Sequence, residues 1–447
     1  MQATPAPVPF ATAFWYWLKL GCISFGGPTG QIAIMHHDLV EEKRWISERR
    51  FLHALNYCMV LPGPEATQLA TYIGWMMHKT RGGIAAGVLF VLPSLFVLIA
   101  LAWIYLAYGD VPSIAGILYG IKPAVIAIVV FAAYRIGSRA LKNALLWSIA
   151  AAAFVAIFAL HVPFPYIVVA AGIIGHLGGR YAPAKFATGG GHGASGAYYG
   201  AAIIDDDTPT PAHALFTWGR CARVCAVGLA LWAGMMALLY VRYGWDSTFM
   251  QMGWFFTKAA LLTFGGAYAV LPYVFQGGVE EFHWLTATQM IDGLGLGETT
   301  PGPLIMVVTF VGFVGGWTRQ LFGPENLFVA GAAAAVVVTY FTFLPSFIFI
   351  FLGAPLIETT HGNLKFTAPL TGITAAVVGV ILNLAVFFAY HVLWPHGLGG
   401  DVEWFSAATG LVALVALFHF KVGIIPLIAA CGMLGLAYSL VGSAPPG

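Results

Sequence analysis

The sequence predicts an all-α polytopic membrane protein made of two inverted-topology repeats, and three observations lead to this fold class. Of the 447 residues, 60% are hydrophobic and only 9% are charged, whereas soluble domains carry about 25% charged residues. Apolar runs of about 20 residues, long enough to span a membrane, recur along the chain. Finally, a motif occurs twice, as Ser24-Phe-Gly-Gly-Pro28 and as Thr263-Phe-Gly-Gly-Ala267, which indicates an internal repeat.

The duplication extends well beyond this motif. The offset of 239 residues that carries Ser24 onto Thr263 aligns the flanking residues without a gap, and a second offset of 252 residues aligns later segments. The identities cluster on Gly, Pro and Trp, so we interpret them as a duplicated unit. The matched pairs include Trp45 with Trp284, Pro62-Gly63-Pro64 with Pro301-Gly302-Pro303, Leu92-Pro-Ser94 with Leu344-Pro-Ser346, and Gly120 with Gly372.

In the first copy, two apolar stretches are each broken near the middle. Residues 10–37 are interrupted at Gly26-Gly27-Pro28, and residues 51–78 are interrupted at Pro62-Gly63-Pro64. Gly weakens a helix, and Pro removes a hydrogen bond and clashes with the preceding turn. Each arm, about 10–16 residues long, is too short to cross a hydrocarbon core of about 30 Å. We therefore expect two broken, re-entrant helical hairpins.

Four ordinary membrane spans are expected after each pair of hairpins. The N-terminal repeat covers residues 1–180, with spans near 83–108, 113–134, 143–160 and 165–179. A Gly-rich cytoplasmic loop and one linker span near 222–241 occupy residues 181–245, because Gly-rich segments behave as flexible linkers. The C-terminal repeat covers residues 246–447, with hairpins 249–278 and 289–318 and spans near 327–352, 366–391, 404–419 and 423–442.

The second repeat is predicted to be upside down relative to the first, because five full spans, an odd number, separate the two pairs of hairpins. The loop between the first two hairpins carries Lys43, Arg44, Arg49 and Arg50, whereas its counterpart contains no Lys or Arg. Basic loops stay on the cytoplasmic side, so the first loop is predicted inside and its counterpart outside. Most other Lys and Arg, including Arg135 and Lys365, then fall in or beside cytoplasmic segments. The N-terminus is predicted to be cytoplasmic and the C-terminus periplasmic, in a bacterial inner membrane.

Broken helices at matching positions of inverted repeats indicate the binding site of a secondary transporter. A helix that starts inside the membrane presents free N–H groups and its positive dipole end, which together bind anions. We predict that the four hairpin tips meet around one substrate cavity; the alternative is tight helix packing by small residues. The tip residues are Gly26, Gly27, Pro28, Pro62, Gly63, Pro64, Gly265, Gly266, Pro301, Gly302 and Pro303.

Ionisable residues at membrane depth are candidate functional residues. Lys122 lies about nine residues into a span, and its counterpart is Thr374, so this cation is not repeated in the second copy. We predict that it is the counter-charge of a bound anion; the alternatives are a side chain that snorkels to the interface or one that pairs with a carboxylate. Lys19 and Lys258 are secondary candidates, because both can snorkel or pair with Glu.

Glu65 and Glu298 lie next to the two Pro-Gly-Pro tips. Each carboxylate is either a partner of a helix dipole or a group that carries a proton in a partly dehydrated cavity. Matching positions His53 and Asp292 are lesser candidates. The five cysteines are interpreted as packing residues, and the histidines show no metal-ligand spacing. No nucleotide-binding loop and no nucleophile–base pair is evident, so we predict no enzymatic activity, no cofactor, no metal and no nucleic-acid partner.

Two groups of motifs resemble the chromate ion transporter family. They are Ser24-Phe-Gly-Gly-Pro-Thr-Gly-Gln31 with Leu61-Pro-Gly-Pro-Glu65, and Thr263-Phe-Gly-Gly-Ala267 with Thr300-Pro-Gly-Pro303. The resemblance covers both repeats and implies a long, two-domain bacterial member that exports chromate, with the proton-motive force as its energy source and sulfate as a close mimic. Chromate, protons and the lipid bilayer are the implied partners; a homo-oligomer is left open. The alternatives are a sulfate-type transporter or importer of the same fold and a passive anion channel.

Overall fold

A computed structural model describes residues 5–186, 199–360 and 367–441. Within these residues the chain folds into seventeen α-helices joined by loops and short 3₁₀ and π turns, without a β-sheet. The all-α fold class is therefore confirmed. Lys365 and most of the Gly-rich loop, including the stretch that begins at Thr188, lie outside the described residues.

The helices break where Gly and Pro predict breaks. In the first half, α1 (Phe10–Ile23) ends before Gly26 and α2 (Gly27–His36) begins after it. In the second half, α10 (Thr248–Leu262) and α11 (Ala267–Phe275) flank Gly265 and Gly266 in the same way. The Pro-Gly-Pro sequences separate α3 (Glu48–Cys58) from α4 (Glu65–Tyr108) and α12 (Ala287–Thr299) from α13 (Val307–Thr318).

Helix α4 reverses direction at His78 and Lys79, whose backbone angles are not helical. A Cβ atom built on Gly82 would lie 2.1 Å from the carbonyl oxygen of Gly74, and one built on Gly87 would touch Thr71. In a straight helix Thr71 and Gly87 would be about 24 Å apart, so the two parts of α4 lie antiparallel. A turn at His78 and Lys79 therefore separates the predicted hairpin 51–78 from the predicted span 83–108, within α4.

The remaining helices match the predicted spans, but not all of them have the predicted length. Residues 80–108 of α4 and four further helices, α5, α9, α14 and α15, are long and apolar enough to cross a membrane. Helices α6, α16 and α17 have only 15–17 residues, about 22–26 Å of rise. The bounds are α5 (Pro112–Ala140), α6 (Ala144–Phe158), α7 (Phe164–Tyr181), α8 (Pro183–Phe186), α9 (Trp218–Tyr243), α14 (Leu327–Thr360), α15 (Thr367–Leu393), α16 (Trp404–Phe418) and α17 (Ile424–Leu440).

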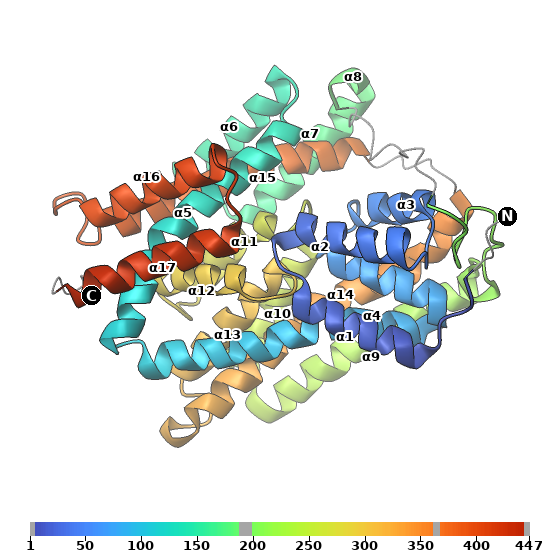
Figure 1. Ribbon diagram of the computed structural model, residues 1–447, viewed down its shortest axis with the longest axis horizontal. Coiled ribbons are helices and arrows are strands. Elements are labelled where there is room, and N and C mark those ends of the chain that lie inside the picture. The colour runs from blue at the N-terminus through green and yellow to red at the C-terminus, as the bar shows by residue number, and fades with distance from the viewer. Residues whose placement is uncertain (1–4, 187–198, 361–366, 442–447) are drawn as a thin grey trace.

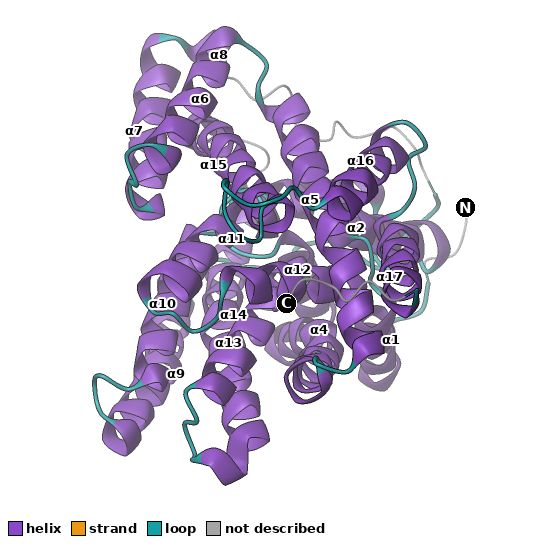
Figure 2. Cartoon of the chain, turned by 90° about the vertical axis from the view of Figure 1, so that its left-hand side faces the viewer, coloured by secondary structure: helices purple, strands orange, loops and turns teal. Residues whose placement is uncertain are grey.

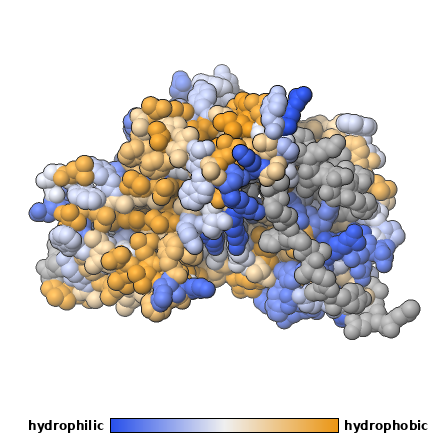
Figure 3. Space-filling view, turned by 90° about the horizontal axis from the view of Figure 1, so that it is seen from above, coloured by the Kyte–Doolittle hydropathy of each residue, from blue (hydrophilic) through white to orange (hydrophobic). Residues whose placement is uncertain are grey.

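Most helices run along the long axis of the molecule (Figure 1). Viewed along this axis, α12 lies near the middle of the bundle, whereas α6, α7 and α9 lie at its edge (Figure 2). On the face seen in Figure 3, apolar side chains cover much of the left-hand part, and hydrophilic ones lie near the middle and on the right. Such an apolar outer surface is what a lipid-facing protein exposes, because lipid tails are as apolar as the side chains.

In each half, one long helix packs against a helix near the C-terminal end of the other half. Helix α5 of the first half packs on α17, where Gly120 lies against Cys431 and Gly435. Helix α15 of the second half packs on α7, where Gly372 lies against Ala171 and Gly175. Gly120 and Gly372 are matched positions, so the two contacts are the same contact with the halves exchanged. An exchange of this kind is what a twofold relation between two copies produces.

Candidate functional site

The hairpin tips of the two halves are joined by a pair of backbone hydrogen bonds. Gly63 donates its N–H to the carbonyl oxygen of Thr263 at 2.7 Å, and Gly302 donates its N–H to that of Ser24 at 2.8 Å. Gly302 is the counterpart of Gly63, and Thr263 is the counterpart of Ser24. The two bonds are thus equivalent, and each joins one hairpin tip of the first half to one hairpin tip of the second half.

Two serines at matched positions pack against the glycines of these bonds. We call the region where the hairpin tips are bonded to each other the crossing. Gly63 packs so tightly against Ser346 that an added Cβ would lie 2.2 Å from the serine Oγ, and Gly302 packs in the same way against Ser94. Gly63 and Gly302 have φ values of +125° and +97°, which L side chains rarely adopt. The Pro-Gly-Pro tips are therefore close-packed backbone junctions whose glycine N–H groups are already engaged, and the substrate-binding role of these residues stays a prediction.

The Phe-Gly-Gly tips have a different environment. Ser24 and Thr263 have φ/ψ angles near −80° and +80°, those of an inverse γ-turn. Gly27 and Gly266 have positive φ, and a Cβ built on either would meet no atom within 4 Å. Open space thus borders these two tips. A Cβ position is thus open at Gly27 and Gly266, whereas it is filled at Gly63 and Gly302.

Four helical segments begin at the tips, namely α2, α4, α11 and the 3₁₀ turn Leu304–Met306, and none has a side-chain cap. Their N-cap residues are Gly26, Pro64, Gly266 and Pro303. Helices that begin in polar loops differ: α3, for example, is capped by Ser47 and α12 by Thr286. The first N–H groups of a helix need a partner, and a negative charge at an N-terminus is favourable. The helix starts at the tips share this lack of a side-chain cap with α5 and α17.

The crossing lies halfway along the membrane-spanning helices. Ser94 is the middle residue of the helical segment 80–108, and α1 packs on this segment with Gly21 against Leu89 and Phe90. The tip that follows α1 therefore reaches the same depth as Ser94. With a rise of about 1.5 Å per residue and a core of about 30 Å, this depth corresponds to the middle of the bilayer.

The same region contains buried polar atoms that have no hydrogen-bond partner among the described residues. The side chain of Gln31 bridges the tips, because its Nε2 donates to the carbonyl oxygen of Gly302 at 2.5 Å. Buried polar groups normally have partners, and hydroxyl groups donate well to oxyanions. These atoms were not singled out from the sequence. They are the Oγ atoms of Ser24, Ser94 and Ser346, Oγ1 of Thr67, and the Oε1 atoms of Gln31 and Gln68.

Lys122 lies beside a carboxylate of the other half. Its Nζ is 4.0 Å from Oδ2 of Asp292, which also accepts a hydrogen bond from Tyr105 at 3.0 Å. Asp292 is 3% exposed and its Oδ1 has no partner in the described structure, whereas Lys122 remains 23% exposed. Of the readings left open by the sequence, pairing with a carboxylate is therefore the one observed. The exposed part of Lys122 leaves room for a second anionic partner.

The two glutamates next to the Pro-Gly-Pro tips have different environments. Glu298 is 7% exposed and accepts a hydrogen bond from Tyr268, and the charge of Arg135 acts on both side chains. Glu65 is the first residue of α4, at its uncapped N-terminus. The sequence reading missed Tyr268, and it placed Arg135 at the cytoplasmic end of a span without linking it to Glu298.

The secondary candidates do not join this cluster. Lys19 is exposed on α1, and Lys258 and His53 are half-buried. None of these three side chains forms an ion pair within the part of the chain that the structure describes. Of the cysteines, Cys58 and Cys431 are buried, but Cys22 and Cys225 are exposed, so the packing interpretation is wrong for this exposed pair.

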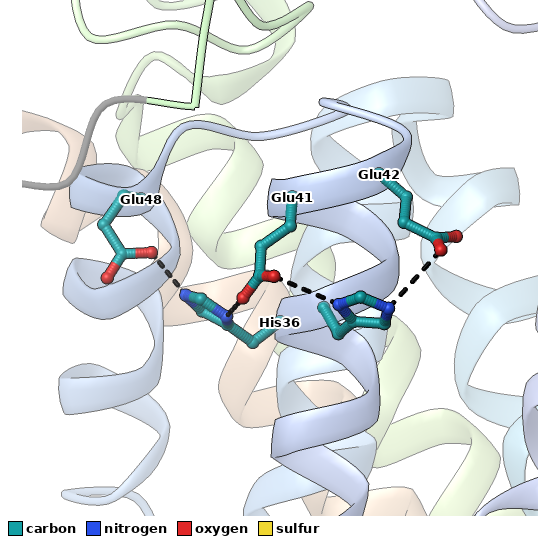
Figure 4. A network of polar contacts seen from close by, with 5 residues as sticks. His36, Glu41, Glu42 and Glu48 are labelled. Atoms are coloured by element: carbon teal, nitrogen blue, oxygen red, sulfur yellow. Dashed lines mark hydrogen bonds and ion pairs between the residues drawn. The ribbon is translucent and has the colours of Figure 1, made fainter.

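A separate group of His and Glu side chains lies in the polar loop between the first two hairpins. His36 contacts both Glu41, at 3.0 Å, and Glu48, as Figure 4 shows. His37 contacts Glu41 at 3.1 Å and Glu42 at 3.4 Å. The pairs are His–Glu contacts, and no set of three or more His, Cys, Asp or Glu residues within the described ranges is arranged to hold a metal ion.

Comparison with known proteins finds one family model and several relatives that are described as chromate transporters. The family model described as Chromate transporter matches residues 11–176 and 250–436, one stretch in each half. A chromate transport protein of Cupriavidus metallidurans is 31% identical over 430 residues, 95% of this chain and 92% of that protein. One of Pseudomonas aeruginosa is 33% identical over 97% of this chain and 94% of that protein. A probable chromate transport protein of Synechococcus elongatus is 30% identical over 90% of this chain and 88% of that protein. No solved structure matches.

Proposed function

The chain belongs to the chromate transporter family, and from this premise we propose that it exports chromate from the bacterial cytoplasm in exchange for protons. Its relatives in Cupriavidus and Pseudomonas, which match nearly their full length, are named chromate transport proteins. The observation that carries the proposal is that helices begin without a side-chain cap at hairpin tips, with N-cap residues Gly26, Pro64 and Gly266, and that the tips of the two halves are bonded to each other. A tetrahedral dianion suits such a site, because it offers four oxygen acceptors to surrounding N–H and O–H donors.

We assign the oxyanion to the open side of the Phe-Gly-Gly tips. The backbone around Gly26–Gly27 and Gly265–Gly266 borders free space, and small residues allow a ligand to approach the backbone closely. The hydroxyl groups of Ser24, Ser94 and Ser346 supply further donors. The prolines at the tips set the breaks that expose these N–H groups, and the Pro-Gly-Pro glycines fix the tips to one another.

Lys122 supplies positive charge to this space. Its counterpart Thr374 lies 3.7 Å from where a Cβ of Gly265 would be, which supports a role of this pair of matched positions beside the hairpin tips. An arriving dianion then competes with Asp292 for the ammonium group. Since opposite charges attract strongly where water is scarce, this competition couples substrate binding to the charge state of Asp292.

Proton exchange is assigned to Glu298 and Glu65. Both lie next to the crossing, and acidic residues at membrane depth are the usual components of proton relays. Tyr268 orients Glu298 through a hydrogen bond, and Glu65, at an uncapped N-terminus, is the candidate in the first half. A proton that enters as chromate leaves connects the two fluxes.

The inverted arrangement supports alternating access, and contacts between loops support the inversion. The loop predicted to be cytoplasmic between the first hairpins pairs with the linker, since Ser47 N–H donates to Ile204 at 2.9 Å and Ile203 N–H to Arg44 at 3.0 Å. Its counterpart contacts a turn predicted outside, where Phe164 N–H donates to Gln276 at 3.0 Å. Each contact joins segments predicted to share one side of the membrane.

Inside-out vesicles test both the direction and the coupling. Because the cytoplasmic face points outward, an acidic lumen drives proton exit, and we expect radiolabelled chromate to accumulate inside and excess sulfate to compete. A protonophore abolishes the accumulation. Uptake that is unchanged without a pH gradient would indicate a passive channel, and uptake only by right-side-out vesicles would indicate an importer.

A further inference from the structure

A long apolar cavity with a basic rim lies between α4, α9 and α14. Its volume is about 660 Å³. Val88, Leu95, Leu231, Val336 and Phe347 are among the side chains that form its walls. An aqueous chromate ion gains nothing from such a surface, because burying a charge without polar partners is costly.

The charged side chains lie at one end of this cavity. Lys79 is at the reversal of α4, and Arg220 and Arg223 are in the first turns of α9. Arg220 also donates hydrogen bonds to loop carbonyls. Within the described residues, none of the three cations lies within salt-bridge distance of a carboxylate. His213 lines the same end, but burial lowers its pKa, so the positive charge comes from the lysine and the arginines.

The cavity has the length of one membrane leaflet. From the rim it follows α4 from Thr80 to Leu95, and α9 from Arg220 to Leu231, about 17–22 Å of helix at about 1.5 Å per residue. One leaflet of a bilayer has a hydrocarbon depth of about 15 Å. Few other parts of the protein pack against α9, since only 17% of its apolar 18-residue stretch is buried.

We propose that this cavity holds an anionic phospholipid of the cytoplasmic leaflet, with its phosphate headgroup between Lys79, Arg220 and Arg223 and an acyl chain along the apolar walls. The charge is complementary, because basic pockets between membrane helices on the cytoplasmic side bind anionic headgroups. The lipid fills the space between the linker helix α9 and the two halves that it connects. This site is independent of the chromate site and of the transport mechanism.

The test uses the purified full-length protein, delipidated in detergent, with phosphatidylglycerol, phosphatidylcholine or glycerol phosphate added. Native mass spectrometry and thermal unfolding report binding. We expect phosphatidylglycerol to bind and to raise the Tm more than phosphatidylcholine does, and glycerol phosphate to have no effect. Arg223→Ala and Lys79→Ala each weaken the binding about fivefold, and Arg223→Lys retains it. Arg139→Ala, a change of an exposed cation outside the cavity, is the control.

A second pair of variants tests whether an acyl chain lies along the apolar walls of the cavity. Val336→Trp fills the cavity and is expected to prevent lipid retention, whereas Val329→Trp, on the exposed surface of the same helix α14, leaves it unchanged. Equal binding of both phospholipids, full binding by Arg223→Ala, or equal stabilisation by glycerol phosphate alone would each overturn the proposal.

Discussion

The N–H of Gly302 lies 2.8 Å from the carbonyl oxygen of Ser24, and this bond joins the tip of one broken helix to the tip of another in the opposite half of the chain. The equivalent bond from Gly63 to Thr263 completes the pair. Since both glycines also pack against serines of matched position, Ser94 and Ser346, the junction holds the site's backbone in place from two directions.

Substitution of either junction glycine is expected to destabilise the protein. Gly63→Ala and Gly302→Ala place a Cβ on a left-handed backbone and against a serine side chain, which together cost about 2–4 kcal/mol. Thermal unfolding in detergent will show a lower Tm, and transport falls with it. Gly234→Ala in α9, where a Cβ meets nothing within 4 Å, serves as the control, with an unchanged or slightly higher Tm. Wild-type stability of both junction variants would show that the crossing is not tight.

A double-mutant cycle separates the two roles of Lys122. Lys122→Gln leaves Asp292 buried without its cation, so we expect a loss of about 1–3 kcal/mol of stability together with loss of chromate transport. Asp292→Asn removes the competing carboxylate, and chromate binds more tightly to this variant. The double variant regains stability because no unpaired charge remains, but it does not regain transport.

The cycle is read from thermal unfolding and from chromate uptake by proteoliposomes. Lys122→Arg is the matched control that keeps the charge. If the double variant transports chromate at the wild-type rate, Lys122 is only the partner of Asp292 and has no role in binding the substrate.

The positions of the helix breaks could be predicted from sequence, because Gly26-Gly27-Pro28 and the Pro-Gly-Pro triplets act on their own local backbone. The reversal at His78 and Lys79 was predictable for a related reason, since a basic turn interrupts two apolar arms. The bond from Gly63 to Thr263 was not predictable in this way. It joins segments that are far apart in the chain, and no local pattern specifies which tips meet.

The partners of the charged residues could likewise not be predicted from the sequence. Lys122 and Asp292 were each noted as candidates, but their approach depends on how α5 packs against α12. The serines at the crossing, Ser94 and Ser346, lie in apolar helices where a lone Ser commonly bonds its own backbone. Their missing partners become visible only after the surrounding helices are placed.

Glu298→Gln is expected to uncouple protons from chromate. The amide keeps the shape of the side chain and a hydrogen bond to Tyr268 but cannot release a proton, so chromate follows its own gradient while proton flux stops. Simultaneous recording of lumenal pH and chromate uptake in inside-out vesicles checks this. Tyr268→Phe, which keeps the carboxyl group, is the comparison and retains coupling at a reduced rate. Proton flux at the wild-type level in Glu298→Gln would transfer the role to Glu65.

The loop between the first hairpins is expected to lose order as pH rises above neutrality. The hydrogen bond that His37 donates to Glu41 raises the pKa of the exposed His37 and lowers the pKa of Glu41. The His37 contribution to stability is therefore complete below its ordinary pKa of about 6.5 and disappears as the pH passes the raised value. The Glu41 contribution is complete above its ordinary pKa of about 4.5 and disappears only as the pH falls through the lowered value.

Hydrogen exchange of residues 37–42, corrected for the intrinsic effect of pH, checks this loop. We expect protection to decrease between about pH 6 and about pH 8, and His37→Gln to remove the decrease. A flat protection profile in the wild-type protein would show that the His37–Glu41 contact does not order the loop. Both side chains are exposed, so the effect is local and the global Tm remains the same.

The inversion of the second half can be tested at one pair of matched, exposed residues, Glu42 and Glu281. Each lies at the end of the π-helical turn in its own half, Glu42 in His37–Glu42 and Glu281 in Gln276–Glu281, so local structure does not favour labelling of either one. In a variant without the five native cysteines, we expect a membrane-impermeant maleimide to label Glu281→Cys in intact spheroplasts and Glu42→Cys only after the membrane is opened. Labelling of both positions from the same side would mean that the halves are parallel, and alternating access by inverted repeats would have to be abandoned.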